Sequence, residues 1–484
     1  GTSALPAMSS GQPRVLLKAY EEGKGSPSLG CVGPQLDGAT LMNKQILPVL
    51  LALFVAVGTA GPVAAASDLS SAVVDEQSIG RDDPTVVLAS EALAKEFDVP
   101  IEVAVDRILE QESLFGLAAD IEEKLGEDFA GAWVDHAEGG ALHVASIDGV
   151  RLDVELAGLD QVVWIEARSS LESMRMALAE ISIQIDSRSI NAHSMWIDVR
   201  ENSLVVETEK ADTSGILDSV LNQIDGKGDV RIKVQQSIAP EAMQAECVDT
   251  HCDAPLRGGS LIQELPGGVC TAGFLATNAF GQERLITAGH CPFGATNNYR
   301  AAQPRSGGWH ITGQPAAVRF TANGDFATLV INNVPGWEPR GIVVVHDSNA
   351  NNRPTVRDER YPINGVGSSG QVGIGGFLCV TGAVNLNPTR CGQLQSVGQT
   401  STYRGVTVNN LGRIGVTVCG GMSGGPVYVG GLGYGIVAAG GGSTFNTNWN
   451  TWALPTRTST CRGNLLYQGL TQILNDFNLT LMAP

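Results

Sequence analysis

The sequence predicts an all-β module over residues 256–484, preceded by an α+β region over residues 67–255. In residues 256–484, short runs of Val, Ile and Leu alternate with Gly, Asn and Pro turns, which is typical of a β-sandwich or β-barrel. In residues 67–255, apolar residues at helical spacing alternate with strand-like runs. A length of 484 residues also exceeds that of one ordinary domain. We call these parts the acidic region (residues 67–255) and the β region (residues 256–484).

The two regions carry net charges of opposite sign. The acidic region has 39 acidic and 13 basic residues, a net charge of −26. The β region has 8 acidic and 14 basic residues, all of them Arg, a net charge of +6. Opposite charges attract the regions to each other, although salt screens part of the attraction, and solubility alone is an equally good explanation of the acidic excess. No basic run is interleaved with aromatic residues, so no nucleic-acid partner is predicted.

The acidic region contains predicted helices and an internal echo. Helical spacing predicts helices over residues 90–97 and 101–114, with residues 117–125 as a continuation or a further helix. Two strand–turn–strand patterns, each with a central Trp and a preceding helical stretch, recur 62–63 residues apart. They indicate two related α+β lobes, with coincidence of the Trp positions as the alternative. The patterns are 132–135 with 142–144, and 195–198 with 204–206, the latter after a helix over 170–183.

The β region is predicted to consist of short strands and one terminal helix. Apolar residues at helical spacing predict a C-terminal helix over residues 464–481. Its spacing depends on Leu465, Leu470, Ile473, Leu474 and Phe477. The clearest strand candidates are residues 285–288, 327–331, 341–345 and 435–439.

The N-terminal segment predicts export. Residues 42–66 are interpreted as a signal peptide, because Met42 and Lys44 precede an apolar run that ends before the small residues 64–66. The run is too short to span a bilayer comfortably, which disfavours a retained anchor. Residues 1–41 lack a periodic apolar pattern and are interpreted as upstream or non-native sequence.

The cysteine count agrees with export. Of nine cysteines, Cys31 precedes the predicted signal cleavage, and eight remain. An even number in an exported chain predicts disulfides, although 105 pairings are open. Pairing in sequence order would close short loops: 247 with 252, 270 with 291, 379 with 391, and 419 with 461. No Cys-x-x-Cys partner accompanies Cys379 or Cys391 and no HExxH occurs, so no metal and no cofactor are predicted.

Three motifs of the β region suggest nucleophilic catalysis. They are residues 285–291 (LITAGHC), 324–330 (GDFATLV) and 419–426 (CGGMSGGP). A serine hydroxyl needs a base within hydrogen-bond reach. We expect His290 to accept the proton of Ser423, and Asp325 to hold the imidazole. The N–H groups of Gly421 and Ser423 are the predicted oxyanion hole.

Two choices in this assignment depend on position in the chain. Asp347 and Asp358 also lie between the His and Ser motifs, but Asp325 opens an apolar strand in which its carboxylate can be buried. The run around Ser423 also matches the G-x-S-x-G elbow of lipases and esterases. That fold requires a His after the serine, and the last His of the chain is His346. The order His, Asp, Ser therefore excludes it.

With these motifs, the β region resembles the chymotrypsin-fold serine peptidases, specifically the bacterial streptogrisin and α-lytic type. The motifs 287–291 (TAGHC) and 423–426 (SGGP) carry the resemblance, and 125–133 (LGEDFAGAW) is similar to the pro-regions of that type. The resemblance implies a double six-stranded β-barrel with a C-terminal helix, and a pro-region that assists folding and inhibits the enzyme until it is removed. It also implies the disulfides Cys270–Cys291, Cys379–Cys391 and Cys419–Cys461, and Cys247–Cys252 completes the sequential set.

One residue departs from this resemblance. Met422 stands where the type usually has an Asp in a buried ion pair; an apolar residue can replace such a pair at little cost in stability. The departure raises the alternative of a proteolytically silent homologue that only binds proteins. Because His290 and Ser423 are both present, an active endopeptidase is favoured.

Specificity and processing are expectations from the same resemblance. The substrate pocket is expected at Thr417 and Val418, with Ala438, Ala439, Gly440 and Gly441 as a wall. No carboxylate falls there, which predicts cleavage after neutral or apolar residues rather than Lys or Arg. The pro-region is expected to be removed either before Cys247 or near residues 253–258. The expected product is a secreted, extracellular monomer whose partners are peptide substrates and its own pro-region, without a membrane contact once the signal is cleaved.

Overall fold

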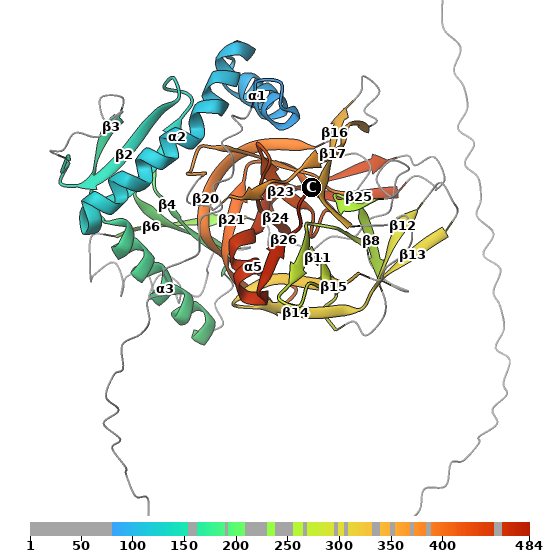
Figure 1. Ribbon diagram of the computed structural model, residues 1–484. Coiled ribbons are helices and arrows are strands. Elements are labelled where there is room, and N and C mark those ends of the chain that lie inside the picture. The colour runs from blue at the N-terminus through green and yellow to red at the C-terminus, as the bar shows by residue number, and fades with distance from the viewer. Residues whose placement is uncertain are drawn as a thin grey trace, which may run out of the picture. The chain divides into compact units, whose positions relative to one another are not determined.

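The computed structural model describes most of residues 80–484 (Figure 1). The predicted signal peptide, residues 1–41 and the pair Cys247–Cys252 lie outside the described residues. No helix among the described residues is long and apolar enough to cross a membrane. The described ranges are 80–152, 162–188, 192–208, 230–237, 255–264, 269–294, 299–303, 308–331, 339–348, 354–367, 372–383, 389–449 and 457–484.

Two helices begin the described part of the acidic region, α1 (Pro84–Phe97) and α2 (Ile101–Leu125). The carboxylate of Asp83 accepts hydrogen bonds from the first-turn N–H groups of α1, which lack partners within the helix. Both predicted helices are present, α1 starting earlier than residue 90. The predicted segments 101–114 and 117–125 form one continuous helix, which ends at Gly126 with a φ of 54°.

Two three-stranded segments with the same topology follow. In each, the first two strands pair antiparallel and the third pairs parallel with the second. This repetition matches the echo seen in the sequence, and α2 and α3 precede the two segments as predicted. The elements are β1 (Phe129–Asp135), β2 (Ala141–Ile147) and β3 (Val162–Ala167), then α3 (Leu171–Arg188), β4 (Ala192–Asp198), β5 (Ser203–Thr208) and β6 (Arg231–Gln236).

The β region is dominated by strands (Figure 1), and one of its buried apolar clusters joins Phe274, Ile286 and Phe326 with Leu470 and Ile473 of the C-terminal helix. One sheet has the order β14-β15-β11-β10-β26, and others include β13-β12-β8-β9 and β17-β16-β7. The predicted all-β region with a helix near its C-terminus is confirmed. The strands are β7 (Leu256–Gly258), β8 (Leu261–Glu264), β9 (Val269–Thr271), β10 (Leu275–Asn278), β11 (Glu283–Thr287), β12 (Tyr299–Gln303), β13 (Gly308–Gly313), β14 (Pro315–Thr321), β15 (Gly324–Val330), β16 (Pro339–Ser348), β17 (Pro354–Pro362), β18 (Gly365–Val366), β19 (Phe377–Val380), β20 (Arg390–Tyr403), β21 (Val406–Ile414), β22 (Val418–Cys419), β23 (Pro426–Val429), β24 (Leu432–Trp449), β25 (Arg457–Gly469) and β26 (Leu479–Leu481).

The C-terminal helix is shorter than predicted. Helix α5 covers Leu470–Phe477, whereas residues 464–469 belong to β25 and residues 479–481 to β26. Leu465 pairs with residues of both β21 and β24, so the backbone hydrogen bonds of this run are made across strands. Asn478 adopts a left-handed conformation, with a φ of 50°, and ends α5. The prediction was therefore wrong at both ends of the helix.

The acidic region and the β region share one continuous sheet. Strand β4 pairs antiparallel with β20, with Ser194 opposite Ser401. The hydroxyl oxygens of these two serines lie 3.0 Å apart, and Ser401 also donates to the carbonyl oxygen of His193 at 3.1 Å. Main-chain hydrogen bonds between strands give such a contact affinity without requiring particular side chains.

Helix α1 makes a second contact between the regions. The hydroxyl of Tyr361, in β17, donates to a carboxylate oxygen of Asp83 at 2.9 Å. The N–H of Gly430 donates to the hydroxyl oxygen of Thr85 at 2.9 Å. Apolar side chains of α2, among them Phe115, join Phe377 of the β region in one buried cluster. The described regions therefore form a common core as well as a common sheet.

His136 belongs to this contact. Its ring nitrogen Nε2 lies 3.0 Å from the carbonyl oxygen of Gly375, and its ring is tilted against that of Phe97 and meets that of Phe377 edge-on. Burial lowers the pKa of His136 to about 4, and the charges of two nearby arginines lower it further. The ring is therefore neutral near pH 7, with the Nε2–H donating to Gly375.

We expect His136 to make the intact chain about 2 kcal/mol less stable at about pH 5 than at about pH 7.5. Its folded pKa of about 4 lies below the ordinary 6.5. The unfolded chain therefore binds more protons between these values, so this stability is complete above pH 6.5 and lost as the pH falls toward 4. Urea unfolding of the Ser423→Ala chain with and without His136→Gln checks this. The Gln amide can still donate to Gly375, but its variant should lack this part of the pH dependence; equal slopes would contradict the assignment.

Candidate active site

The His and Asp motifs meet because their strands are neighbours. Strand β11 pairs antiparallel with β15, with Thr287 opposite Ala327, so the end of β11 lies beside the start of β15. Between β11 and His290 stands Gly289, where an added methyl group would lie 1.9 Å from a backbone carbonyl oxygen of β14. A side chain at this position would force the turn away from its neighbour, so the glycine allows His290 to reach Asp325.

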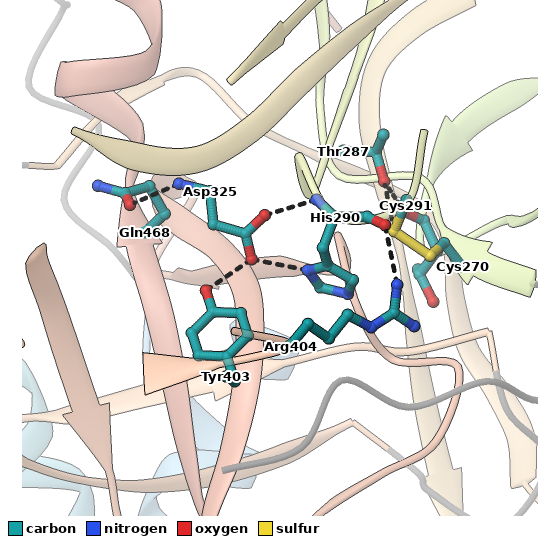
Figure 2. Close-up of polar contacts among 9 residues, drawn as sticks. Cys270, Thr287, His290, Cys291, Asp325, Tyr403, Arg404 and Gln468 are labelled. Carbon is teal, nitrogen blue, oxygen red and sulfur yellow. Dashed lines mark hydrogen bonds and ion pairs between the residues drawn. A yellow bond between two sulfur atoms is a disulfide. The ribbon is translucent and has the colours of Figure 1, made fainter. Parts of the chain in front are cut away.

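His290 and Asp325 form a buried pair that is joined by two hydrogen bonds (Figure 2). Nδ1 of His290 lies 2.7 Å from Oδ2 of Asp325, and the backbone N–H of His290 donates to Oδ1 at 2.7 Å. The side chains are 1% and 0% exposed. A carboxylate that accepts from Nδ1–H leaves the lone pair of a neutral imidazole on Nε2. Among the described residues, Nε2 has no hydrogen-bond partner, so it is available as a base.

The rival carboxylates lie elsewhere. Asp358 is in β17, where it accepts a hydrogen bond from the N–H of Arg360 at 2.7 Å. Asp347 pairs with Thr355 across β16 and β17. Of the three candidates, the structure brings Asp325 to His290.

Sequence reasoning missed further groups around Asp325. The hydroxyl of Tyr403 donates to Oδ2 of Asp325 at 2.7 Å, and the N–H of Asp325 donates to Oε1 of Gln468 at 3.2 Å (Figure 2). Arg404 donates to the carbonyl oxygen of His290 at 3.1 Å. Burial and the negative charge of Asp325 raise the pKa of Tyr403 well above its ordinary value, so the phenol keeps its proton. No local motif marks these residues, because they come from strands distant in the sequence.

The loop that carries Ser423 connects β22 to β23 and packs against the His motif. Gly421 and Gly424 have φ values of 90° and 84°, which side chains rarely adopt. A methyl group at Gly424 would lie 2.1 Å from the hydroxyl oxygen of Thr287 and 2.9 Å from the backbone nitrogen of Ala288. The loop that contains Ser423 is therefore held in contact with the residues just before His290. No hydrogen bond joins the Ser423 hydroxyl to Nε2 among the described residues.

Two peptide N–H groups of this loop are available for an external acceptor. The N–H groups of Met422, Gly424 and Gly425 donate to backbone carbonyls at 2.7–3.2 Å. Among the described residues, those of Gly421 and Ser423 have no such acceptor. These are the two donors that the sequence assigned to the oxyanion hole, and a negatively charged oxygen would be stabilised between them.

Three disulfides tie these elements together. Cys270–Cys291 fixes β9 to the residue beside His290, Cys419–Cys461 fixes the start of the Ser423 loop to β25, and Cys379–Cys391 joins β19 to β20. These are three of the four pairs expected from the sequence. Cys270, His290 and Cys291 lie close enough to suggest a metal site, but both sulfur atoms are used in the disulfide and provide no thiolate.

Residues expected at the substrate pocket come together beside this loop. A methyl group at Gly440 would lie 2.7 Å from Cγ1 of Val418 and 2.9 Å from Cβ of Arg462. At buried Gly441, an added methyl group would meet nothing within 4 Å, which indicates open space. Ala439 is buried and Thr417 half-buried. Sequence reasoning missed Arg462, a nearly fully buried cation opposite Val418 in the strand pairing.

Met422 is accommodated as a core residue. Its side chain is fully buried in a cluster that includes Val380, Ala383 and Val427. Its sulfur lies 3.4 Å from the backbone nitrogen of Cys419. Apolar contacts of Met422 thus support the Ser423 loop at the position where the streptogrisin and α-lytic type usually has a buried ion pair.

Comparisons with known proteins find similarity to bacterial proteases and to a protease pro-domain. The family model described as the N-terminal pro-domain of α-lytic protease matches residues 102–153. Streptogrisin-C of Streptomyces griseus is 25% identical over 393 residues, which cover 81% of this chain and 74% of that protein. Among solved structures, Nocardiopsis protease NAPase is 25% identical over 48% of this chain and all of its own, with a TM-score of 0.34. An α-lytic protease homologue, N4, is 22% identical over 47% of this chain and 99% of its own, with a TM-score of 0.32.

These relatives support a serine endopeptidase with an N-terminal pro-region. Within that class, the chain is similar to streptogrisin-C and to the α-lytic protease pro-domain. The pro-region match lies inside the acidic region and includes the motif over residues 125–133 that suggested it.

Proposed function

We propose that the chain is the zymogen of a secreted serine endopeptidase whose catalytic triad is His290, Asp325 and Ser423. The observation that carries this proposal is the buried His290–Asp325 pair, with Nδ1 bonded and Nε2 available. The packing of the Ser423 loop against residues 287 and 288 supports the third member. The three disulfides support an extracellular location, because such bonds persist in oxidising compartments.

The proposed reaction passes through an acyl-enzyme. Nε2 of His290 takes the proton of the Ser423 hydroxyl as Oγ attacks the scissile carbonyl carbon. The carbonyl electrons move to its oxygen, which the N–H groups of Gly421 and Ser423 stabilise. The imidazolium gives its proton to the leaving amine, and the C–N bond breaks. Water then attacks the ester by the same proton transfers, releasing the acid and regenerating Ser423.

The acidic region is the proposed pro-region, residues 67–255. Its shared sheet with β20 and its net negative charge support a role as an inhibitor and folding aid for the positively charged β region. Removal would have to occur before Leu256, because β7 pairs with β16 and is buried. This favours a cut before Cys247 or between residues 253 and 255 over one at residues 256–258.

The proposed substrates are peptides with a neutral or apolar residue before the scissile bond. The residues at the expected pocket, Val418, Ala439 and Gly440, carry no negative charge that would pair with a Lys or Arg side chain, and Arg462 lies beside them. In a peptide series varied at this position, fastest cleavage after Lys or Arg would contradict the assignment. Fastest cleavage after Glu would instead make Arg462 the specificity residue.

Labelling by a fluorophosphonate tests the triad. The matured protein should be labelled on the peptide that contains Ser423, because only a hydroxyl activated by His290 reacts with this reagent at useful rates. His290→Ala and heat-denatured protein are the controls and should stay unlabelled. A folded mature protein that remains unlabelled would favour the alternative of a silent protein-binding homologue.

A further inference from the structure

Tyr403 brings a phenol hydroxyl to the carboxylate of Asp325 (Figure 2). Its oxygen lies 2.7 Å from Oδ2, the same oxygen that accepts from Nδ1 of His290 at 2.7 Å. The other oxygen, Oδ1, accepts from the backbone N–H of His290. Because its two oxygens accept from three donors, the carboxylate can rotate only by breaking hydrogen bonds. Hydrogen bonds to a charged group are stronger than those between neutral groups.

The tyrosine itself is held rigidly. It is 2% exposed and packs in a cluster with Phe320, Val408 and Ala438. Its ring meets the imidazole of His290 edge-on, with centroids 6.1 Å apart and an angle of 90° between planes. Phe320 lies 5.7 Å from the Tyr403 ring and 5.9 Å from the His290 ring. A side chain so enclosed transmits its position to the groups it bonds.

Few charged groups face this phenol. Asp325 is its hydrogen-bond partner and His290 its ring neighbour. Arg404, the next residue, lowers the pKa of the phenol by its positive charge, but burial and Asp325 outweigh it. Gln468, on β25, is neutral and bonds the backbone of Asp325. The phenol therefore stays protonated and donates to the Asp325 carboxylate.

We propose that Tyr403 is a positioning residue of the active site, whose hydroxyl orients Asp325 and withdraws part of its negative charge from His290. This inference rests on the proposed function of His290, Asp325 and Ser423. It assigns to Tyr403 an electrostatic effect that packing alone does not have. Removal of the hydroxyl leaves Oδ2 with the imidazole as its remaining side-chain donor, which frees the carboxylate to rotate and favours the imidazolium.

The test is Tyr403→Phe in the matured enzyme, assayed with a peptide substrate across pH. We expect kcat to fall about tenfold, from lost orientation of the base, with KM little changed. We expect the acid limb of kcat/KM to move up by about half a pH unit, because Asp325 then keeps more negative charge with which to stabilise the imidazolium of His290. A purely structural role would lower the active fraction without moving the pH profile.

Tyr428→Phe is the matched control. Tyr428 is also fully buried, and its hydroxyl lies 2.6 Å from that of Thr381 and donates to the carbonyl oxygen of Val344 at 3.2 Å. This variant removes an equivalent buried hydroxyl without touching Asp325. It should lose stability and keep the wild-type pH profile.

A second variant covers the case in which Tyr403→Phe does not fold. Site-specific 3,5-difluorotyrosine at position 403 keeps the ring and makes the hydroxyl a stronger donor, so the acid limb should move to lower pH. An unmoved limb in the variant that folds would overturn the proposal. Fluorophosphonate labelling of the wild type separates this proposal from the proposed function on which it rests. If the wild type is not labelled at Ser423, the proposed triad is wrong. If the wild type is labelled but the acid limb of the variant does not move, only the role of Tyr403 is refuted.

Discussion

Replacing Ser423 by Ala should lower kcat for peptide hydrolysis by about a million-fold, to the residual rate that binding and the oxyanion hole supply. The hydroxyl is the atom that forms the covalent bond to the substrate, and no neighbouring group of the loop can replace it. Its removal leaves the N–H groups of Gly421 and Ser423 in place. Steady-state hydrolysis of a fluorogenic peptide at matched protein concentration measures the loss.

Ser396→Ala is the control for this change. Ser396 is a buried serine of β20 whose hydroxyl donates to Oε1 of Gln399 at 3.3 Å. The control should retain activity within about threefold. Hydrolysis by Ser423→Ala at more than about one per cent of the wild-type rate would identify another nucleophile.

Replacing Asp325 by Asn should lower kcat near neutral pH by about ten thousand-fold while leaving the fold intact. The carboxylate now accepts three hydrogen bonds, one of them from Nδ1 of His290. An amide NH₂ placed at Oδ2 would donate to Nδ1 instead, which moves the imidazole proton to Nε2 and removes the base. Peptide hydrolysis, with circular dichroism to verify folding, checks the expectation.

Asp358→Asn is the matched control, since it makes the same chemical change at a rival carboxylate. Asp358 accepts from a neighbouring backbone N–H and is only half-buried. Its variant should retain activity within about twofold. A loss at Asp358 equal to that at Asp325 would show that charge in this half of the molecule, rather than contact with His290, determines the effect.

The candidate triad could be predicted because each member lies in a local motif. His290 and Ser423 are surrounded by small residues that allow close packing of the backbone. Gly289 and Gly424 indeed lie against backbone atoms with which a side chain would clash. Asp325 was preferred because it opens an apolar strand, and the pairing of β11 with β15 is what brings it to His290.

Tyr403 and Gln468 could not be predicted in the same way. A tyrosine within a strand has the same sequence signature whether its hydroxyl meets water, a carbonyl or a carboxylate. Its contact with Asp325 arises from packing between β14, β20 and β21, which bring Phe320, Tyr403 and Val408 into one cluster. Arg462 was missed for a similar reason, because its position beside Val418 depends on the register of β22 with β25.

The misread C-terminal helix has a different cause. Leu465, Leu470 and Ile473 fit a helical period, yet a short apolar run fits a buried strand equally well. Residues 464–469 form a strand because β24 and β21 provide hydrogen-bond partners on both sides of β25. Only residues beyond Gly469, where that pairing stops, were free to form α5.

Strand β26 has a consequence for the order in which the molecule is assembled during synthesis. Its residues pair with β10, and Met482 donates to the carbonyl oxygen of Leu275, near the other end of the β region. The sheet holding β11 and β15 thus lacks an edge strand until residues 479–481 have left the ribosome. Contacts between such distant segments form slowly, whereas the pairing of β1 with β2 joins near neighbours in the chain that are translated first. The hairpin β1–β2 can therefore form before the sheet that holds β11 and β15 is complete.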